Sequence, residues 1–99
     1  MLHIVNKSPT ENTSLDSCLR VAGAGNALLL IEDAVYAATK GSPGESKIRN
    51  AIPSLKVYAL APDLEARGMT GALTEGVELV NYGGFVELVA QHRAVHSWL

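Results

Sequence analysis

The sequence predicts an α/β fold of three layers, α/β/α, built on a mostly parallel sheet of four to five strands. Short apolar runs recur along the chain and are separated by segments of helical character. The runs lack the polar alternation of strands with one face in water, so both faces of the sheet are expected to be covered. No repeat or linker divides the 99 residues, which predicts a single domain over residues 1–99.

The first strand is expected at residues 2–5, the run LHIV, which ends at the polar stretch NKSP. Thr13 and Asp16 have the spacing of a capping box, and a helix over residues 14–22 is predicted to follow. The glycines of GAGN, residues 23–26, then end this helix in a tight turn. They follow a helix and precede a strand, which is the reverse of a dinucleotide-binding loop, so no phosphate site is expected there.

Further strands are expected at residues 27–32, 56–61 and 77–81. The intervening stretches AVYAATK and ESKIRNAI are predicted helices, and PDLEARG is a turn closed by glycine. In YGGFVELVAQHR, the residues Phe85, Leu88 and Val89 have helical spacing. The last residues, VHSWL, are a candidate fifth strand at an edge. Helical crossovers between consecutive strands predict that the four main strands are parallel.

Composition excludes several classes of protein. The net charge of −2 argues against direct nucleic-acid binding, and a single cysteine cannot form an internal disulfide. No apolar run reaches the roughly 20 residues that span a bilayer, and the start has no signal-peptide layout. The expectation is a soluble, cytoplasmic protein without a membrane span.

Polar residues follow the predicted strands at the edge where ligands gather in parallel sheets. Lys7 and Asp33 lie at neighbouring strand ends, which predicts an ion pair or a polar pocket shared with Tyr36. The alternative is solvated loop charges and an aromatic side chain at an interface. Glu32 precedes Asp33, but neighbouring strand residues point to opposite faces and make a poor acid pair.

No metal site is expected. His92 and His96 have the spacing of two ligands on one helix face, but no HExxH pattern surrounds them and no third ligand is near. The helix is predicted to end between them. His3 lies inside the first strand, so satisfied or solvated histidines explain the pattern.

Cys18, the only cysteine, allows two interpretations. Leu15, Cys18, Leu19 and Ala22 form one helical face, which is typical of a buried core thiol. Against this, Cys18 lies in the second turn of its helix, where the positive helix end would lower a thiol pKa slightly. The residues alone leave both interpretations open.

Five stretches together resemble one family over essentially the whole chain: LHIVNKSP, SLDSCLR, LLLIEDAVYAA, KVYALAPDLEARG and YGGFVELV with HSWL. They are similar to the DsrH/TusB family of small sulfur-relay subunits. The resemblance implies a DsrE-like fold and a heterohexamer with two related DsrE-like subunits. It also implies delivery of persulfide sulfur to a small DsrC/TusE-like carrier protein, as a sulfurtransferase complex without cofactors.

Cys18 matches the cysteine of the DsrH type in SLxSCL, whereas subunits of the tRNA-thiolation type commonly lack it. The resemblance therefore implies the dissimilatory sulfur-oxidation branch, with Cys18 as a candidate persulfide site secondary to a cysteine of the partner. The alternatives are a non-catalytic structural subunit and the tRNA 2-thiouridine branch. Cys18 is expected near a subunit surface and partly accessible, and loss of charge at Lys7 is expected to slow transfer. Other subunits should bury part of ALLLIED, AVYAAT or FVELV…WL.

Overall fold

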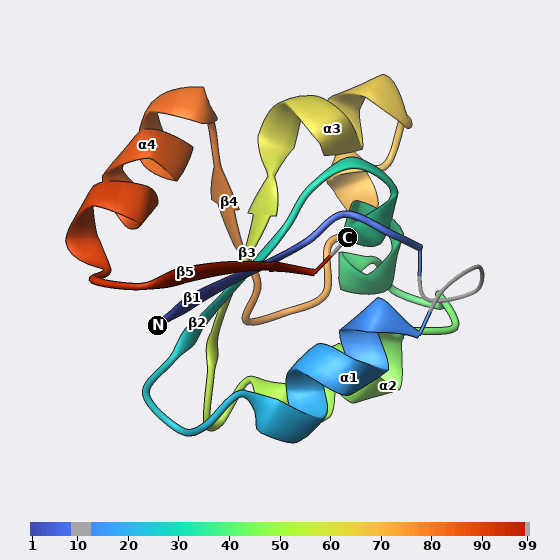
Figure 1. Cartoon of the computed structure of the whole chain (residues 1–99). Helices are drawn as coiled ribbons and strands as arrows, with labels where there is room; N and C mark the ends of the chain where they lie inside the picture. Colours follow the sequence, from blue (N-terminus) through green and yellow to red (C-terminus); the bar gives the residue numbers. More distant parts are fainter. Residues whose placement is uncertain (9–12, 99) are drawn as a thin grey trace.

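The computed structural model describes residues 1–8 and 13–98 (Figure 1). Its strands are β1 (Leu2–Val5), β2 (Ala27–Leu30), β3 (Lys56–Leu60), β4 (Glu78–Val80) and β5 (Val95–Trp98). Its α-helices are α1 (Ser14–Val21), α2 (Glu45–Ala51), α3 (Ala61–Ala66) and α4 (Tyr82–Gln91). Two 3-10 segments complete it, η1 (Glu32–Ala38) and η2 (Thr70–Ala72).

The strands form one sheet in the order β4-β3-β2-β1-β5, and every pair is parallel. The four predicted main strands and their parallel pairing are confirmed, and so is the short strand at the edge. The last strand pairs with the first, with Leu2 opposite Val95. The sheet therefore has β4 and β5 as its two edges.

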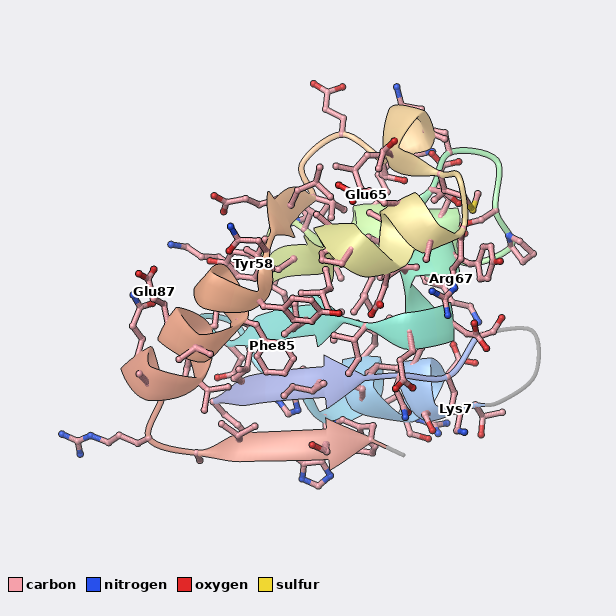
Figure 2. All side chains as sticks on the ribbon, turned by 90° about the horizontal axis from the view of Figure 1, so that it is seen from above. Lys7, Tyr58, Glu65, Arg67, Phe85 and Glu87 are labelled. Atoms are coloured by element: carbon pink, nitrogen blue, oxygen red, sulfur yellow. The ribbon has the colours of Figure 1, made fainter. Side chains whose placement is uncertain are left out.

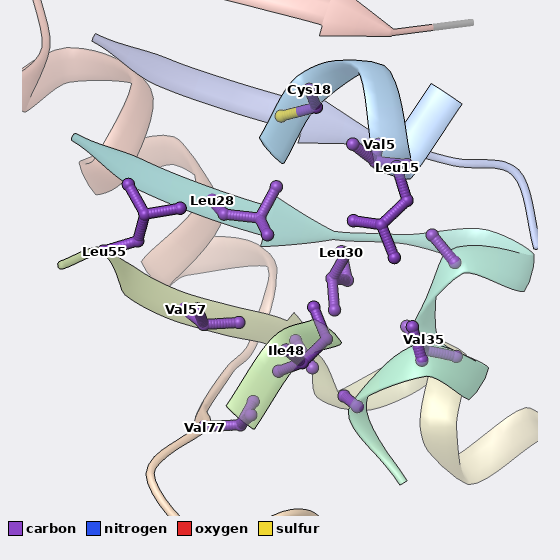
Figure 3. Packing of buried hydrophobic residues seen from close by; sticks show 14 of the residues in the cluster. Val5, Leu15, Cys18, Leu28, Leu30, Val35, Ile48, Leu55, Val57 and Val77 are labelled. Carbon is purple, nitrogen blue, oxygen red and sulfur yellow. The ribbon is translucent and has the colours of Figure 1, made fainter. Parts of the chain in front are cut away.

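Helices cover both faces of this sheet, as the apolar runs require (Figure 1). On one face α1 and α2 bury Leu28 and Val57, with Leu15 of α1 in the same cluster (Figure 3). On the other face Leu88 of α4 packs in a smaller cluster with Leu29. Side chains alternate along each strand, so consecutive residues of one apolar run supply both clusters.

The second crossover differs from the prediction. The sequence predicts a strand through residue 32 and a helix over AVYAATK, whereas β2 ends at Leu30 and η1 is a 3-10 segment. Ile31 still donates its N–H to the Val5 carbonyl at 3.0 Å, and at Glu32 the backbone takes a φ of 49°. The strand therefore ends two residues before the predicted end, and the left-handed Glu32 turns the chain out of the sheet.

The predicted capping box is wrong. Thr13 stands at the N-cap of α1, but its side chain caps no N–H. Asp16 instead forms an ion pair with Lys47 of α2, and Nζ of the lysine lies 2.6 Å from Oδ1 of the aspartate. The shorter aspartate serves the contact between two helices, whereas a glutamate at this position would reach back to the cap.

Candidate functional site

Cys18 lies on the face of α1 that meets the sheet, and its exposed fraction is 0%. It belongs to the cluster that contains Val5, Leu15 and Leu28, and Figure 3 shows it on α1 beside the strands of the sheet. The prediction of a partly accessible cysteine is therefore wrong for the free chain. The helical face of Leu15, Cys18, Leu19 and Ala22 gave the correct indication of burial.

Burial also changes the chemistry of the thiol. Desolvation of the thiolate raises the pKa of Cys18 from its ordinary value of 9.0 to about 11. At neutral pH Cys18 is therefore a protonated, shielded thiol.

A polar cluster lies at the carboxyl edge of the sheet, where ligand sites of parallel sheets form. Arg67 joins its members: Nη2 is 2.7 Å and Nε 3.1 Å from Oδ1 of Asp33. The same guanidinium donates to the Asp63 carbonyl at 3.0 Å and lies 5.9 Å from the centre of the Tyr36 ring. The hydrogen bonds that Arg67 donates to Asp33 raise the pKa of the guanidinium.

The predicted ion pair between Lys7 and Asp33 is wrong, because Arg67 occupies the carboxylate of Asp33. Lys7 is exposed at the same end of the sheet, and no ion pair of it is recorded among the described residues (Figure 2). Asp33 and Tyr36 do come together, but around Arg67. A supporting role of Lys7 in sulfur transfer stays a prediction.

Arg67 is not identified as a site residue from the sequence, because EARG is predicted to be part of a turn. Arg67 follows Asp63 by four positions, a spacing that brings two residues to one side of a helical turn. This spacing was the sequence signal that could have indicated a contact between Arg67 and Asp63. The packing of α3 against η1 then brings Arg67 to Asp33, across 34 positions of sequence. Only the tertiary fold determines that contact.

Glu32 at the end of β2 has a strained backbone, since a left-handed conformation costs a non-glycine residue roughly 1 kcal/mol or more. Asp63 stabilises it, because its Oδ2 accepts the N–H of Glu32 at 2.6 Å. Asn6 adds a longer bond, from Nδ2 to Oε2 of Glu32 at 3.3 Å. Asp63 of α3 and Asn6 after β1 thus fix the turn at Glu32, the first residue of η1.

Replacing Arg67 by alanine is expected to lower the free energy of unfolding by about 1–2 kcal/mol, because three contacts of a half-buried guanidinium are lost. The matched control Lys7→Ala removes a solvated charge and should change stability by less than about 0.5 kcal/mol. Urea unfolding followed by circular dichroism measures both. Equal losses in the two variants would contradict this account of the cluster.

The histidines do not form a metal site in the described part of the chain. Helix α4 ends at Gln91, before His92, whereas the sequence predicts its end between His92 and His96. His92 therefore follows the helix, and His96 lies on β5. Among the described residues no group of three or more histidine, cysteine, aspartate or glutamate side chains could hold a metal ion. In the same part of the chain no helix has the length and apolar character needed to cross a bilayer.

The predicted interface segments differ in what they expose. The run ALLL of β2 is buried within the domain, and AVYAAT exposes mainly Tyr36. Helix α4, in contrast, presents Tyr82, Val86 and Val89 at exposed fractions of 61%, 68% and 38%. These three residues have the spacing i, i+4 and i+7 and form one stripe, here called the α4 stripe. An apolar stripe in water is typical of a protein-binding surface.

Comparison with known proteins agrees with this fold. The structure superposes on the crystal structure of the YchN protein of Escherichia coli with a TM-score of 0.82, 22% identity and coverage of 97% of both chains. It superposes on the protein MTH1491 of Methanobacterium thermoautotrophicum with a TM-score of 0.76, 19% identity, and coverage of 97% and 95%. At such identities the likeness shows the fold alone, and the predicted DsrE-like α/β architecture is confirmed.

Sequence comparison extends this result to a family. A family model described as "DsrH like protein" matches residues 7–95. The chain is 43% identical over 98 residues to Protein TusB of Serratia proteamaculans, covering 99% of this chain and 100% of the relative. With the same coverage it is 40% identical to Protein TusB of Escherichia coli K12. The chain therefore belongs to the DsrH/TusB family.

Proposed function

We propose that this chain is a subunit of a sulfur-relay complex that supplies sulfur for 2-thiouridine in tRNA. Within the complex it completes the assembly and shapes the docking surface, while a cysteine of a partner subunit carries the sulfur. The observation that carries this proposal is the complete burial of Cys18, the only thiol of the chain.

Sulfur relay requires a thiolate that attacks the outer sulfur of a persulfide, so that one S–S bond forms as another breaks. The attacking sulfur must be deprotonated and must be reached by a cysteine of another protein. In the free chain Cys18 meets neither requirement, because its pKa is raised to about 11 and its surface is covered. The candidate role of Cys18 as a persulfide site stays a prediction.

The choice of branch rests on the relatives. Those at 43% and 40% identity are named TusB, which favours tRNA thiolation over the dissimilatory sulfur oxidation expected from Cys18. The burial of Cys18 makes this cysteine a weak indicator of the sulfur-oxidation branch. A small apolar side chain of another type could fill the same packing position, so the residue type there does not identify the pathway. The cysteine in SLxSCL is then a packing residue and no longer identifies the sulfur-oxidation type.

The partners proposed are two related DsrE-like subunits and a small DsrC/TusE-like sulfur carrier. The α4 stripe is the surface proposed for contact with a subunit, since it places apolar side chains of Tyr82, Val86 and Val89 in water. Burial of this stripe would supply the hydrophobic contribution to assembly, which scales with the apolar area removed from water. The chain offers apolar contact area here and no exposed thiol.

Mass spectrometry of the assembled complex tests the division of labour. The complex is incubated with a persulfide donor, and each subunit is weighed in the wild type and in Cys18→Ala. We expect a gain of about 32 Da, one sulfur, on a partner subunit and none on this chain. A gain on this chain that disappears in Cys18→Ala would overturn the structural role and establish Cys18 as a sulfur site.

A separate measurement tests the branch. Deletion of the gene should reduce 2-thiouridine in total tRNA, measured by chromatography of the nucleosides, and expression of Cys18→Ala should restore it. Unchanged 2-thiouridine in the deletion strain would contradict the tRNA branch. Restoration by the wild type alone would contradict the proposed packing role of Cys18.

A further inference from the structure

Strand β5 forms one edge of the sheet, with β1 on one side and no described strand on the other (Figure 2). Leu2 donates its N–H to the Ala94 carbonyl at 3.0 Å, and a parallel ladder uses the backbone groups of alternate residues. The N–H and C=O groups of Val95 and Ser97 therefore face away from β1. Both residues are exposed, so this edge can accept another strand.

Ligand sites typically have volumes of about 300–1,000 Å³. A hollow of about 650 Å³ lies beside this edge. It is lined by Met1, His3, Val21, Asn26, His96 and Trp98. Inside it, Trp98 donates from Nε1 to Nδ1 of His3 at 3.1 Å. The ring of His96 lies against that of Trp98, with centroids 4.4 Å apart. The hollow therefore borders the same strand that has the free backbone groups.

His3 in this hollow has an incomplete set of hydrogen bonds. Its exposed fraction is 4%, and its Nε2 has no partner among the described residues. Burial, followed by the charge of His96, lowers the pKa of His3, so the ring is neutral at neutral pH. Since Nδ1 accepts from Trp98, the single proton of the neutral ring lies on Nε2. The site thus holds a buried donor without an acceptor, an arrangement that destabilises the free chain.

The charges around the edge also have one sign. Residues 1–8 and 92–98 contain Lys7, Arg93 and all three histidines, and no aspartate or glutamate. The chain as a whole has a net charge of −2, so its acidic residues lie elsewhere, including Glu78 on the opposite edge strand β4. A partner that is complementary to the β5 edge is therefore acidic.

We propose that β5 binds an acidic extended segment of a partner protein, which pairs with Val95 and Ser97 as an added strand and directs a carboxylate toward His3 and His96. Alternate side chains of an added strand point to the same face of the sheet, so every second residue faces the hollow. Its carboxylate would lie beside the exposed ring of His96, at the hollow that His3 also lines. This surface is distinct from the α4 stripe, and the inference does not depend on the sulfur relay.

The fluorescence of Trp98 tests the inference directly, because it is the only tryptophan of the chain. The full chain is titrated with a capped peptide of alternating valine and glutamate, and with a matched peptide in which lysine replaces glutamate. We expect a saturable change with the glutamate peptide and at least about tenfold weaker binding of the lysine peptide. Equal binding of the two peptides, or no saturable change up to about 1 mM, would overturn the proposal.

Two variants of one residue test the added strand. Ser97→Pro removes an outward N–H and should weaken binding of the glutamate peptide at least about tenfold, whereas Ser97→Ala keeps that N–H and should bind as the wild type does. Thermal melts establish that each variant is folded. If Ser97→Pro does not fold, His96→Ala at an exposed position takes its place and should also bind more weakly. Unchanged affinity in the folded variant would overturn the proposal.

Discussion

A thiol reagent should modify the native protein at least about 1,000-fold more slowly than the unfolded chain, because Cys18 becomes accessible only when the core opens. The reaction then follows the small population of open molecules, and a stability of about 5 kcal/mol keeps that population below about 1 in 1,000. The burial of the sulfur between α1 and the sheet is the cause. Absorbance after mixing with an aromatic disulfide, with and without denaturant, measures the ratio. Rapid release of one equivalent by the native chain would contradict it.

The raised pKa of the Cys18 thiol also predicts how the free energy of unfolding depends on pH. The pKa of Cys18 is about 11 in the folded chain and near 9.0 when the thiol is solvated, so the unfolded state loses its proton first as the pH rises. The contribution of the Cys18 thiol to the free energy of unfolding is therefore fully present below pH 9 and is lost between pH 9 and about 11. Cys18→Ala lacks this group and should lose less stability over the same interval. Parallel curves for the two proteins would contradict the raised pKa.

Val86→Glu should weaken assembly with the partner subunits by at least about 100-fold, because it places an unpaired charge in the α4 stripe. Val86 is the most exposed member of the stripe at 68%, so the variant is expected to fold normally. Sedimentation of a mixture with the two related subunits measures the loss. A comparison of Val86→Glu with a control variant that carries the same added charge elsewhere separates the loss of contact through α4 from the general effect of added charge.

Ser46→Glu is the matched control for Val86→Glu. It adds the same charge at an exposed position of α2, on the helix layer that covers the other face of the sheet. This variant should assemble as the wild type does. Equal weakening in both variants would point to electrostatic repulsion over the whole surface, and no weakening in Val86→Glu would remove α4 from the interface.

The framework of the fold could be predicted because apolar runs and crossovers are local features. LHIV and ALLL are apolar on both faces, and such runs suit only strands covered on both sides. The end of β2 could not be predicted, since the left-handed backbone of Glu32 is stabilised by Asp63 from a distant helix. The 3-10 form of η1 has no local signal in AVYAATK either.

The candidate site was predicted in part for the same reason. The helical face of Leu15 and Cys18 indicated burial correctly, because it depends on spacing within one helix. The partner of Asp33 was predicted incorrectly: strand order placed Lys7 nearby, but the packing of α3 brought Arg67 closer. The hollow around His3 could not be predicted, because it requires the first and last strands to lie side by side.

The pairing of β1 with β5 has a consequence for folding during synthesis. Strand β1 lies inside the finished sheet, yet one of its two neighbours consists of residues 95–98. As the chain emerges from the ribosome, β1 can pair with β2 once residue 30 has appeared, but its other edge stays open until residues 95–98 appear. Contacts with such sequence separation form slowly, and an open apolar edge attracts other strands. Between these two points the nascent chain has an unpaired apolar strand edge, which favours early contact with a chaperone or a partner subunit.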